Sequence, residues 1–187
     1  MSPKIIVVDG PDNSGKSTLI NKLLNNTNFK LIDFPKKING KCISIGTDND
    51  KALVETLYKF LDPNFVYILD RGYPSNIVYS GFLRGEMDPF EELKDWEEFK
   101  EEFNVIEVIL TRNPLDEDFE DDLIKLSKDE FNMTIRQYET HFKNVFKILN
   151  HDGKNNLLNV DTVELKRLNG YINYEVSKRN ALQRPLH

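Results

Sequence analysis

Short apolar runs alternate with amphipathic stretches along most of the chain. Runs at residues 4–9, 65–69 and 105–111 are rich in β-branched and aromatic residues and contain few polar ones. Such runs are typical of strands buried on both faces of a parallel sheet. Two further runs predict strands at residues 29–34, which Pro35 closes, and at residues 156–161. The pattern therefore predicts a sheet of about five strands.

Between these runs, apolar residues recur every three or four positions, which is the spacing of an amphipathic helix. This spacing predicts helices over residues 16–24, 50–61, 75–83, 90–103, 129–149 and 163–179. Strands that alternate with helices favour an α/β protein with a mostly parallel sheet. The sequence contains no internal repeat or linker, so we expect a single domain over residues 1–187.

Composition and charge narrow the range of partners. The 187 residues carry 25 basic and 31 acidic side chains, a net charge of −6, which argues against broad binding of duplex nucleic acid. The single cysteine, Cys42, cannot form an intrachain disulfide, so a reducing compartment such as the cytoplasm is expected. No apolar run reaches the ~20 residues of a membrane span, and the N-terminus lacks a signal-peptide pattern. The abundance of Asn and Lys is typical of an AT-rich genome, such as that of some viruses.

The most informative segment begins at Gly10 and reads Gly-Pro-Asp-Asn-Ser-Gly-Lys-Ser-Thr through Thr18. It fits the phosphate-loop motif G-x-x-x-x-G-K-[ST] in full and lies between a predicted strand and a predicted helix, the context that this motif requires. Glycines let successive N–H groups point at one anion, and a helix N-terminus adds positive charge. In such a loop Lys16 contacts the β- and γ-phosphates, and the Ser17 hydroxyl binds Mg²⁺. We expect the rest of the loop to bind ATP through Gly10, Asn13, Ser14, Gly15 and Thr18.

Other segments favour a small kinase over other nucleotide-binding classes. A GTPase would need a base-recognition motif such as Asn-Lys-x-Asp, but Asn21-Lys22 is followed by Leu23-Leu24. The predicted strand at 65–69 ends in Asp70-Arg71, and ligands of open parallel sheets bind beyond the carboxyl ends of the strands. A cation there would face the phosphate loop.

These segments resemble the thymidylate kinase family of nucleoside monophosphate kinases. The resemblance lies in the phosphate loop with Asp12 inside it, in Phe34-Pro35 with the nearby Lys37, and in Asp70-Arg71 followed by Ser75 and Tyr79. It implies a three-layer P-loop fold, ATP and Mg²⁺ as cofactors, and a small nucleotide as acceptor. Because the family often forms homodimers, it also implies a second copy of the chain as a partner.

Carried over to this sequence, the resemblance implies a role for each of these residues. Asp12 would bind the 3′-hydroxyl of the acceptor, and Phe34 and Tyr79 would lie against its sugar and base. Lys37 and Arg71 would contact the acceptor phosphate, and Ser75 would also bind the acceptor. Asp70 would hold Mg²⁺ through water or orient Arg71. The catalytic set is then Lys16, Arg71, Asp70 and Asp12.

The sequence also departs from the family pattern. The family places a catalytic arginine in the phosphate loop or in a lid, but position 13 is Asn13 and the lid segment, about residues 112–130, is strongly acidic. Arg112, predicted to bind ATP, and Arg136, predicted to bind the acceptor, are the arginines near it. A dTMP-like monophosphate is the expected acceptor. A deoxynucleoside, a polynucleotide 5′-end, a hydroxylated base in DNA, and a nucleotide-binding module without catalysis remain alternatives.

Overall fold

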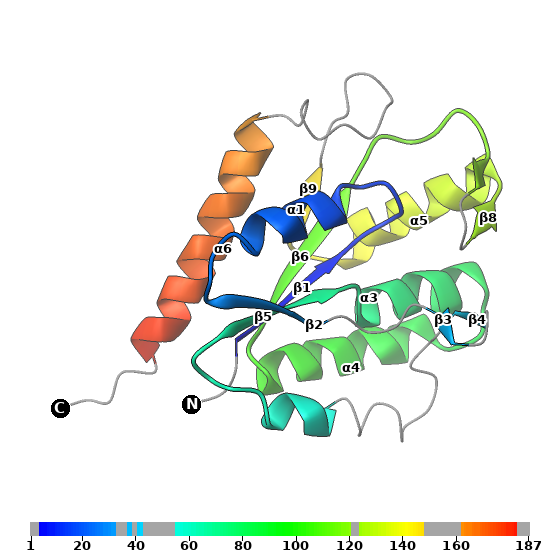
Figure 1. Cartoon of the computed structure of the whole chain (residues 1–187). Helices are drawn as coiled ribbons and strands as arrows, with labels where there is room; N and C mark the ends of the chain where they lie inside the picture. Colours follow the sequence, from blue (N-terminus) through cyan, green and yellow to red (C-terminus); the bar gives the residue numbers. More distant parts are fainter. Residues whose placement is uncertain are drawn as a thin grey trace.

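The computed structural model describes residues 4–32, 37–38, 41–42, 55–120, 124–147 and 162–182. Its centre is a five-stranded sheet in the spatial order β2-β5-β1-β6-β9 (Figure 1). All neighbouring strands of this sheet pair in parallel, which confirms the predicted fold class, an α/β three-layer sandwich of the P-loop type. The strands are β1 (Lys4–Asp9), β2 (Phe29–Ile32), β5 (Val66–Asp70), β6 (Val105–Thr111) and β9 (Val145–Lys147).

Helices cover both faces of the sheet (Figure 1). Alternate residues of β1 point to opposite faces, so Ile5 and Val7 join one apolar cluster while Ile6 and Val8 join the other. One face carries α3 (Tyr73–Asn76), the π-helix η1 (Ile77–Leu83), α4 (Pro89–Glu102) and α5 (Lys128–His141). The other face carries α1 (Lys16–Leu23) and α6 (Thr162–Leu182). Residues 55–59 are also helical.

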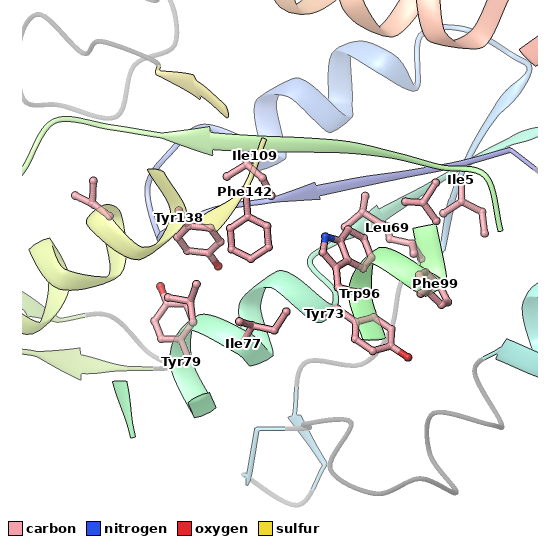
Figure 2. Packing of buried hydrophobic residues seen from close by; sticks show 14 of the residues in the cluster. Ile5, Leu69, Tyr73, Ile77, Tyr79, Trp96, Phe99, Ile109, Tyr138 and Phe142 are labelled. Atoms are coloured by element: carbon pink, nitrogen blue, oxygen red, sulfur yellow. The ribbon is translucent and has the colours of Figure 1, made fainter. Parts of the chain in front are cut away.

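Aromatic side chains fill the first of these clusters. Figure 2 shows Tyr73, Trp96 and Phe99 packed beside Ile5 and Leu69 of the sheet. The Tyr73 and Trp96 rings are stacked with centroids 5.8 Å apart. This packing fixes α3 and α4 on the sheet and holds the segment that follows β5 in place.

The long helix predicted over residues 129–149 is wrong beyond His141. Phe142 has extended backbone angles, φ −113° and ψ 148°, and Val145–Lys147 forms β9 beside β6. Phe142 packs into the cluster of α4 and α5, whereas Phe146 packs into the cluster of α1 and α6. A continuous helix would place residues 142 and 146, four apart, on one face, so the chain must leave the helix at Phe142 for the two side chains to reach opposite faces of the sheet. The predicted strand at 156–161 lies outside the described residues.

Other elements also differ from the sequence prediction. The helix expected over residues 75–83 begins two residues earlier, as α3, and continues as the π-helix η1. The acidic stretch at 115–120 contains β7 (Phe119–Glu120), which pairs with β8 (Lys125–Leu126), and Phe119 is buried. A second small sheet pairs β3 (Lys37–Ile38) with β4 (Lys41–Cys42). Within the described ranges, no helix combines the length and the apolar character that crossing a membrane would need.

A buried carboxylate ties α4 to β6. Glu107 is 2% exposed, and its Oε2 accepts hydrogen bonds from Trp96 Nε1 at 2.7 Å and from Lys100 Nζ at 3.0 Å. Its Oε1 accepts from the backbone N–H groups of Lys143 and Asn144, each at 3.2 Å. The charge is therefore fully paired at the point where α5 gives way to β9.

We predict that Glu107→Ala destabilises the protein by about 3–5 kcal/mol, because it leaves the Lys100 charge and the Trp96 N–H without their buried acceptor. Urea unfolding followed by the fluorescence of Trp96 measures the change. Glu98→Ala is the matched control, since Glu98 forms an exposed ion pair with Lys94 on the same helix. Equal unfolding midpoints for the two variants would contradict the prediction.

Candidate active site

The phosphate loop and the Asp-Arg segment meet at one edge of the sheet. They follow β1 and β5, which pair in parallel with Val8 opposite Asp70. The loop 10–15 and residues 71–75 therefore leave adjacent strands at the same end, as the sequence predicts.

The loop has the backbone geometry that an anion-binding loop needs. Gly10 has φ +140°, and a Cβ atom there would lie 1.9 Å from the carbonyl oxygen of Leu110 on β6, so no larger residue fits. Gly15 takes the left-handed conformation and precedes α1, whose N-terminus has no side-chain cap. The Ser14 hydroxyl is buried and has no hydrogen-bond partner within the described part of the chain. Unpaired donors thus gather where a phosphate would bind.

Lys16 lies buried inside this loop. Its Nζ donates hydrogen bonds to the carbonyl oxygens of Gly10 at 3.0 Å and Pro11 at 2.7 Å. Burial, together with the positive charge of Arg71, lowers the pKa of Lys16 to about 7, although nearby carboxylates partly offset the effect. An anion bound in the loop would therefore stabilise the charged form of this lysine.

Arg71 reaches from the end of β5 into the phosphate loop. Its Nη1 donates to the Gly10 carbonyl at 3.1 Å and to Ser75 Oγ at 2.9 Å, while Nη2 forms an ion pair with Asp12. Burial opposes its charge, but Asp12, together with Tyr138, Asp9 and Tyr79, outweighs this effect, so the pKa of Arg71 lies above its usual value. Its backbone has φ +75°, a strained conformation for a residue with a side chain.

Asp12 and Tyr79 complete this contact. Tyr79, on η1, donates its hydroxyl to Asp12 Oδ2 at 3.1 Å, and the guanidinium of Arg71 lies 5.8 Å from the centroid of its ring. Burial and the neighbouring Asp12 raise the pKa of Tyr79 above its usual range, so the hydroxyl stays protonated and acts as a donor. The predicted residues Asp12, Arg71, Ser75 and Tyr79 thus lie together beside Lys16.

Asp9 is the residue that sequence reasoning missed. It is fully buried, and its Oδ1 accepts from Gly10 N at 2.6 Å, Ser75 Oγ at 2.6 Å and the Tyr138 hydroxyl at 2.9 Å. Its Oδ2 accepts from the N–H groups of Gly72 at 2.9 Å and Ser75 at 3.0 Å. The only signal in the sequence is a carboxylate at the end of a strand that is otherwise apolar.

Arg112 supplies a further cation at the phosphate loop. It follows β6, is 8% exposed, and its Nη1 lies 3.4 Å from the carbonyl oxygen of Asn13. Burial lowers the pKa of Arg112. The Phe131 ring centroid of α5 is 5.9 Å from its guanidinium. Of the arginines near the acidic segment, this one reaches the loop.

The remaining predicted residues divide into those near the loop and those that the structure does not bring to it. Ser17 is exposed at the start of α1, Thr18 follows it, and Asp70 ends β5 beside the loop. Arg136 is exposed on α5, and its role in binding the acceptor stays a prediction. Phe34 lies outside the described residues, and Lys37 lies in β3.

Comparisons with known proteins add a distant structural likeness. No protein-family model matches the sequence, and neither does any curated protein. Eleven chains of solved structures match it, among them thymidylate kinase from Ehrlichia chaffeensis. That chain is 17% identical, with a TM-score of 0.45, and the match covers 90% of this chain and 98% of the other. A likeness of this size carries no function, so the case for one rests on the residues of the site.

The lowered pKa of Lys16 predicts a pH-dependent stability. Between pH 7 and about 10, the unfolded chain holds a proton on this lysine that the folded chain has lost, so the contribution of Lys16 to stability rises with pH. Lys16→Met removes the buried charge. We expect this variant to melt at a higher temperature than the wild type at pH 6.5, with the difference shrinking toward pH 9.5. Thermal melts without nucleotide check this, and a difference that is constant with pH would contradict it.

Proposed function

We propose that this protein is a phosphotransferase that moves the γ-phosphate of ATP to a deoxynucleoside monophosphate, with a dTMP-like acceptor favoured. The observation that carries the proposal is the position of Arg71. It brings a fixed cation from a neighbouring strand to within hydrogen-bond distance of the phosphate loop, 3.1 Å from the Gly10 carbonyl. Transfer between two anionic phosphates needs positive charge between them and in-line placement, and little covalent chemistry from the protein.

The cofactors fit the residues present. The uncapped N-terminus of α1, the buried Ser14 hydroxyl and Lys16 suit the phosphates of ATP. Mg²⁺ typically takes one or two protein ligands and fills its other positions with waters and phosphate oxygens. Ser17 and Asp70 would be those ligands, and within the described ranges no cluster of three or more metal-binding side chains competes with them. When bound, the ion would neutralise charge that develops on the transferred phosphate.

The side chains of the site would then each have a separate role in the transfer. Lys16 and Arg112 would hold the donor phosphates from the loop and from the end of β6. Arg71 would contact the acceptor phosphate and the group in transfer. To do so, its guanidinium exchanges part of its ion pair with Asp12 for the phosphate, and Asp12 becomes free to accept a hydrogen bond from the acceptor sugar. Tyr79 would lie beside the acceptor base.

The experiment is a coupled ADP-release assay with ATP, Mg²⁺ and each nucleoside monophosphate in turn, ribo and deoxy. We expect turnover with at least one deoxynucleoside monophosphate. If labelled phosphate appears on a deoxynucleoside, a DNA 5′-end or hydroxylated DNA, and on none of the monophosphates, the proposed acceptor is wrong and that substrate takes its place. ATP binding in calorimetry without transfer to any acceptor would indicate a nucleotide-binding module and overturn the proposal.

Arg71→Ala is expected to lower kcat by about 10³-fold or more, since it removes a cation that stabilises the transition state. Arg84→Ala is the matched control. Arg84 is exposed and contacts Glu86 4.0 Å away, so its removal should leave turnover within about twofold. Thermal melts of both variants separate a loss of chemistry from a loss of fold. Equal turnover by the two variants would remove Arg71 from the mechanism.

A further inference from the structure

A tyrosine of α5 reaches beneath the phosphate loop. Tyr138 is fully buried, and its hydroxyl donates to Asp9 Oδ1 at 2.9 Å and lies 3.3 Å from Ser75 Oγ. Figure 2 shows the hydroxyls of Tyr138 and Tyr79 pointing into the same space between α5 and η1. A buried hydroxyl is costly unless it forms a hydrogen bond, and here the buried carboxylate of Asp9 supplies the acceptor. The Tyr138 hydroxyl is therefore part of the hydrogen-bond network of the site.

The hydroxyl is linked to Arg71 by short steps. Ser75 Oγ donates to Asp9 Oδ1 at 2.6 Å and accepts a hydrogen bond from Arg71 Nη1 at 2.9 Å. The same Nη1 lies 3.8 Å from Asp9 Oδ1. The chain Tyr138, Asp9, Ser75, Arg71 is therefore continuous, and its far end is the cation that faces the phosphate loop.

The helix that carries Tyr138 also touches the second arginine of the site. Phe131, two turns earlier on α5, lies with its ring centroid 5.9 Å from the Arg112 guanidinium and is fully buried. The helix begins at a capping box in which Ser127 and Glu130 pair reciprocally, so its start is well defined. One rigid helix thus braces both Arg71 and Arg112.

We propose that Tyr138 is a positioning residue, whose hydroxyl holds Asp9 and Ser75 in the arrangement that orients the Arg71 guanidinium toward the phosphate being transferred. The proposal rests on the proposed function. Without the hydroxyl, Asp9 Oδ1 keeps Gly10 N and Ser75 Oγ as donors, but the serine loses its fixed neighbour and Arg71 gains freedom to turn. A small misplacement of such a group lowers kcat more than it weakens substrate binding, because the contacts of the group strengthen in the transition state.

The first test compares Tyr138→Phe with Tyr58→Phe. Tyr58 is also a buried tyrosine, 4% exposed, but it packs against Phe99 and Phe103, outside the chain from Tyr138 to Arg71. We expect Tyr138→Phe to lower kcat by about tenfold to 100-fold while the KM for ATP changes by less than about threefold. Tyr58→Phe should keep wild-type kcat. A purely structural hydroxyl would lower the melting temperature of Tyr138→Phe and leave kcat unchanged, which would overturn the proposal.

The second test asks whether Tyr138 acts through Arg71. In an Arg71→Lys background, the added Tyr138→Phe should lower kcat by less than about threefold, because the group it positions is gone. If Tyr138→Phe lowers kcat in the Arg71→Lys background by the same factor as in the wild type, the proposal is overturned. A readout without turnover is the ¹⁵N NMR signal of the Arg71 guanidinium, assigned by its absence in Arg71→Lys. We expect Tyr138→Phe to shift and broaden it and Tyr58→Phe to leave it in place.

These readouts separate the two claims. A wild-type protein that transfers phosphate to no acceptor, but whose Arg71 signal responds to Tyr138→Phe, would overturn the proposed function and leave the positioning of Arg71 intact. An active enzyme in which both kcat and the Arg71 signal ignore Tyr138→Phe would overturn the role of Tyr138 alone.

Discussion

The site depends on one buried charge, the carboxylate of Asp9. Burial of an ion costs several kcal/mol unless hydrogen bonds replace its water, and here the donors come from three separate parts of the chain. Gly10 N opens the phosphate loop, Gly72 N and Ser75 belong to the turn after β5, and the Tyr138 hydroxyl comes from α5. Because these donors share the same two oxygens, the three segments converge on one point, and the geometry of the site follows from that convergence.

The distribution of charge around this point explains how an acidic protein can suit an anionic ligand. The net charge of −6 describes the whole chain, but Lys16, Arg71 and Arg112 all approach the phosphate loop. Burial, and after it the charge of Arg71, lowers the pKa of Lys16, while Asp12 partly offsets both effects. A bound phosphate would offset the repulsion between these cations more fully. The cations thus favour a small anion at this edge of the sheet.

The sequence predicts the parts of the molecule that local patterns determine. The strands β1, β5 and β6 are apolar runs, and the phosphate-loop motif needs only the eight consecutive residues from Gly10 to Ser17, so both could be predicted directly. The role of Asp9 could not, because its partners Ser75 and Tyr138 lie 66 and 129 residues away. The end of α5 was missed for a related reason: Phe142 and Phe146 keep helical spacing, and only the sheet reveals that they face opposite layers.

Arg71 could be predicted from the sequence as a residue of the site, but the orientation of its guanidinium depends on tertiary structure. Its backbone adopts φ +75°, and its guanidinium is held by the Gly10 carbonyl, by Asp12 and by Ser75 from different directions. The π-helix η1 adds Tyr79, whose hydroxyl fixes Asp12, and wide helical turns of this kind often occur at functional sites. A cation already fixed in this way needs little reorganisation when charge develops beside it, and that preorganisation is the main contribution a protein makes to phosphoryl transfer.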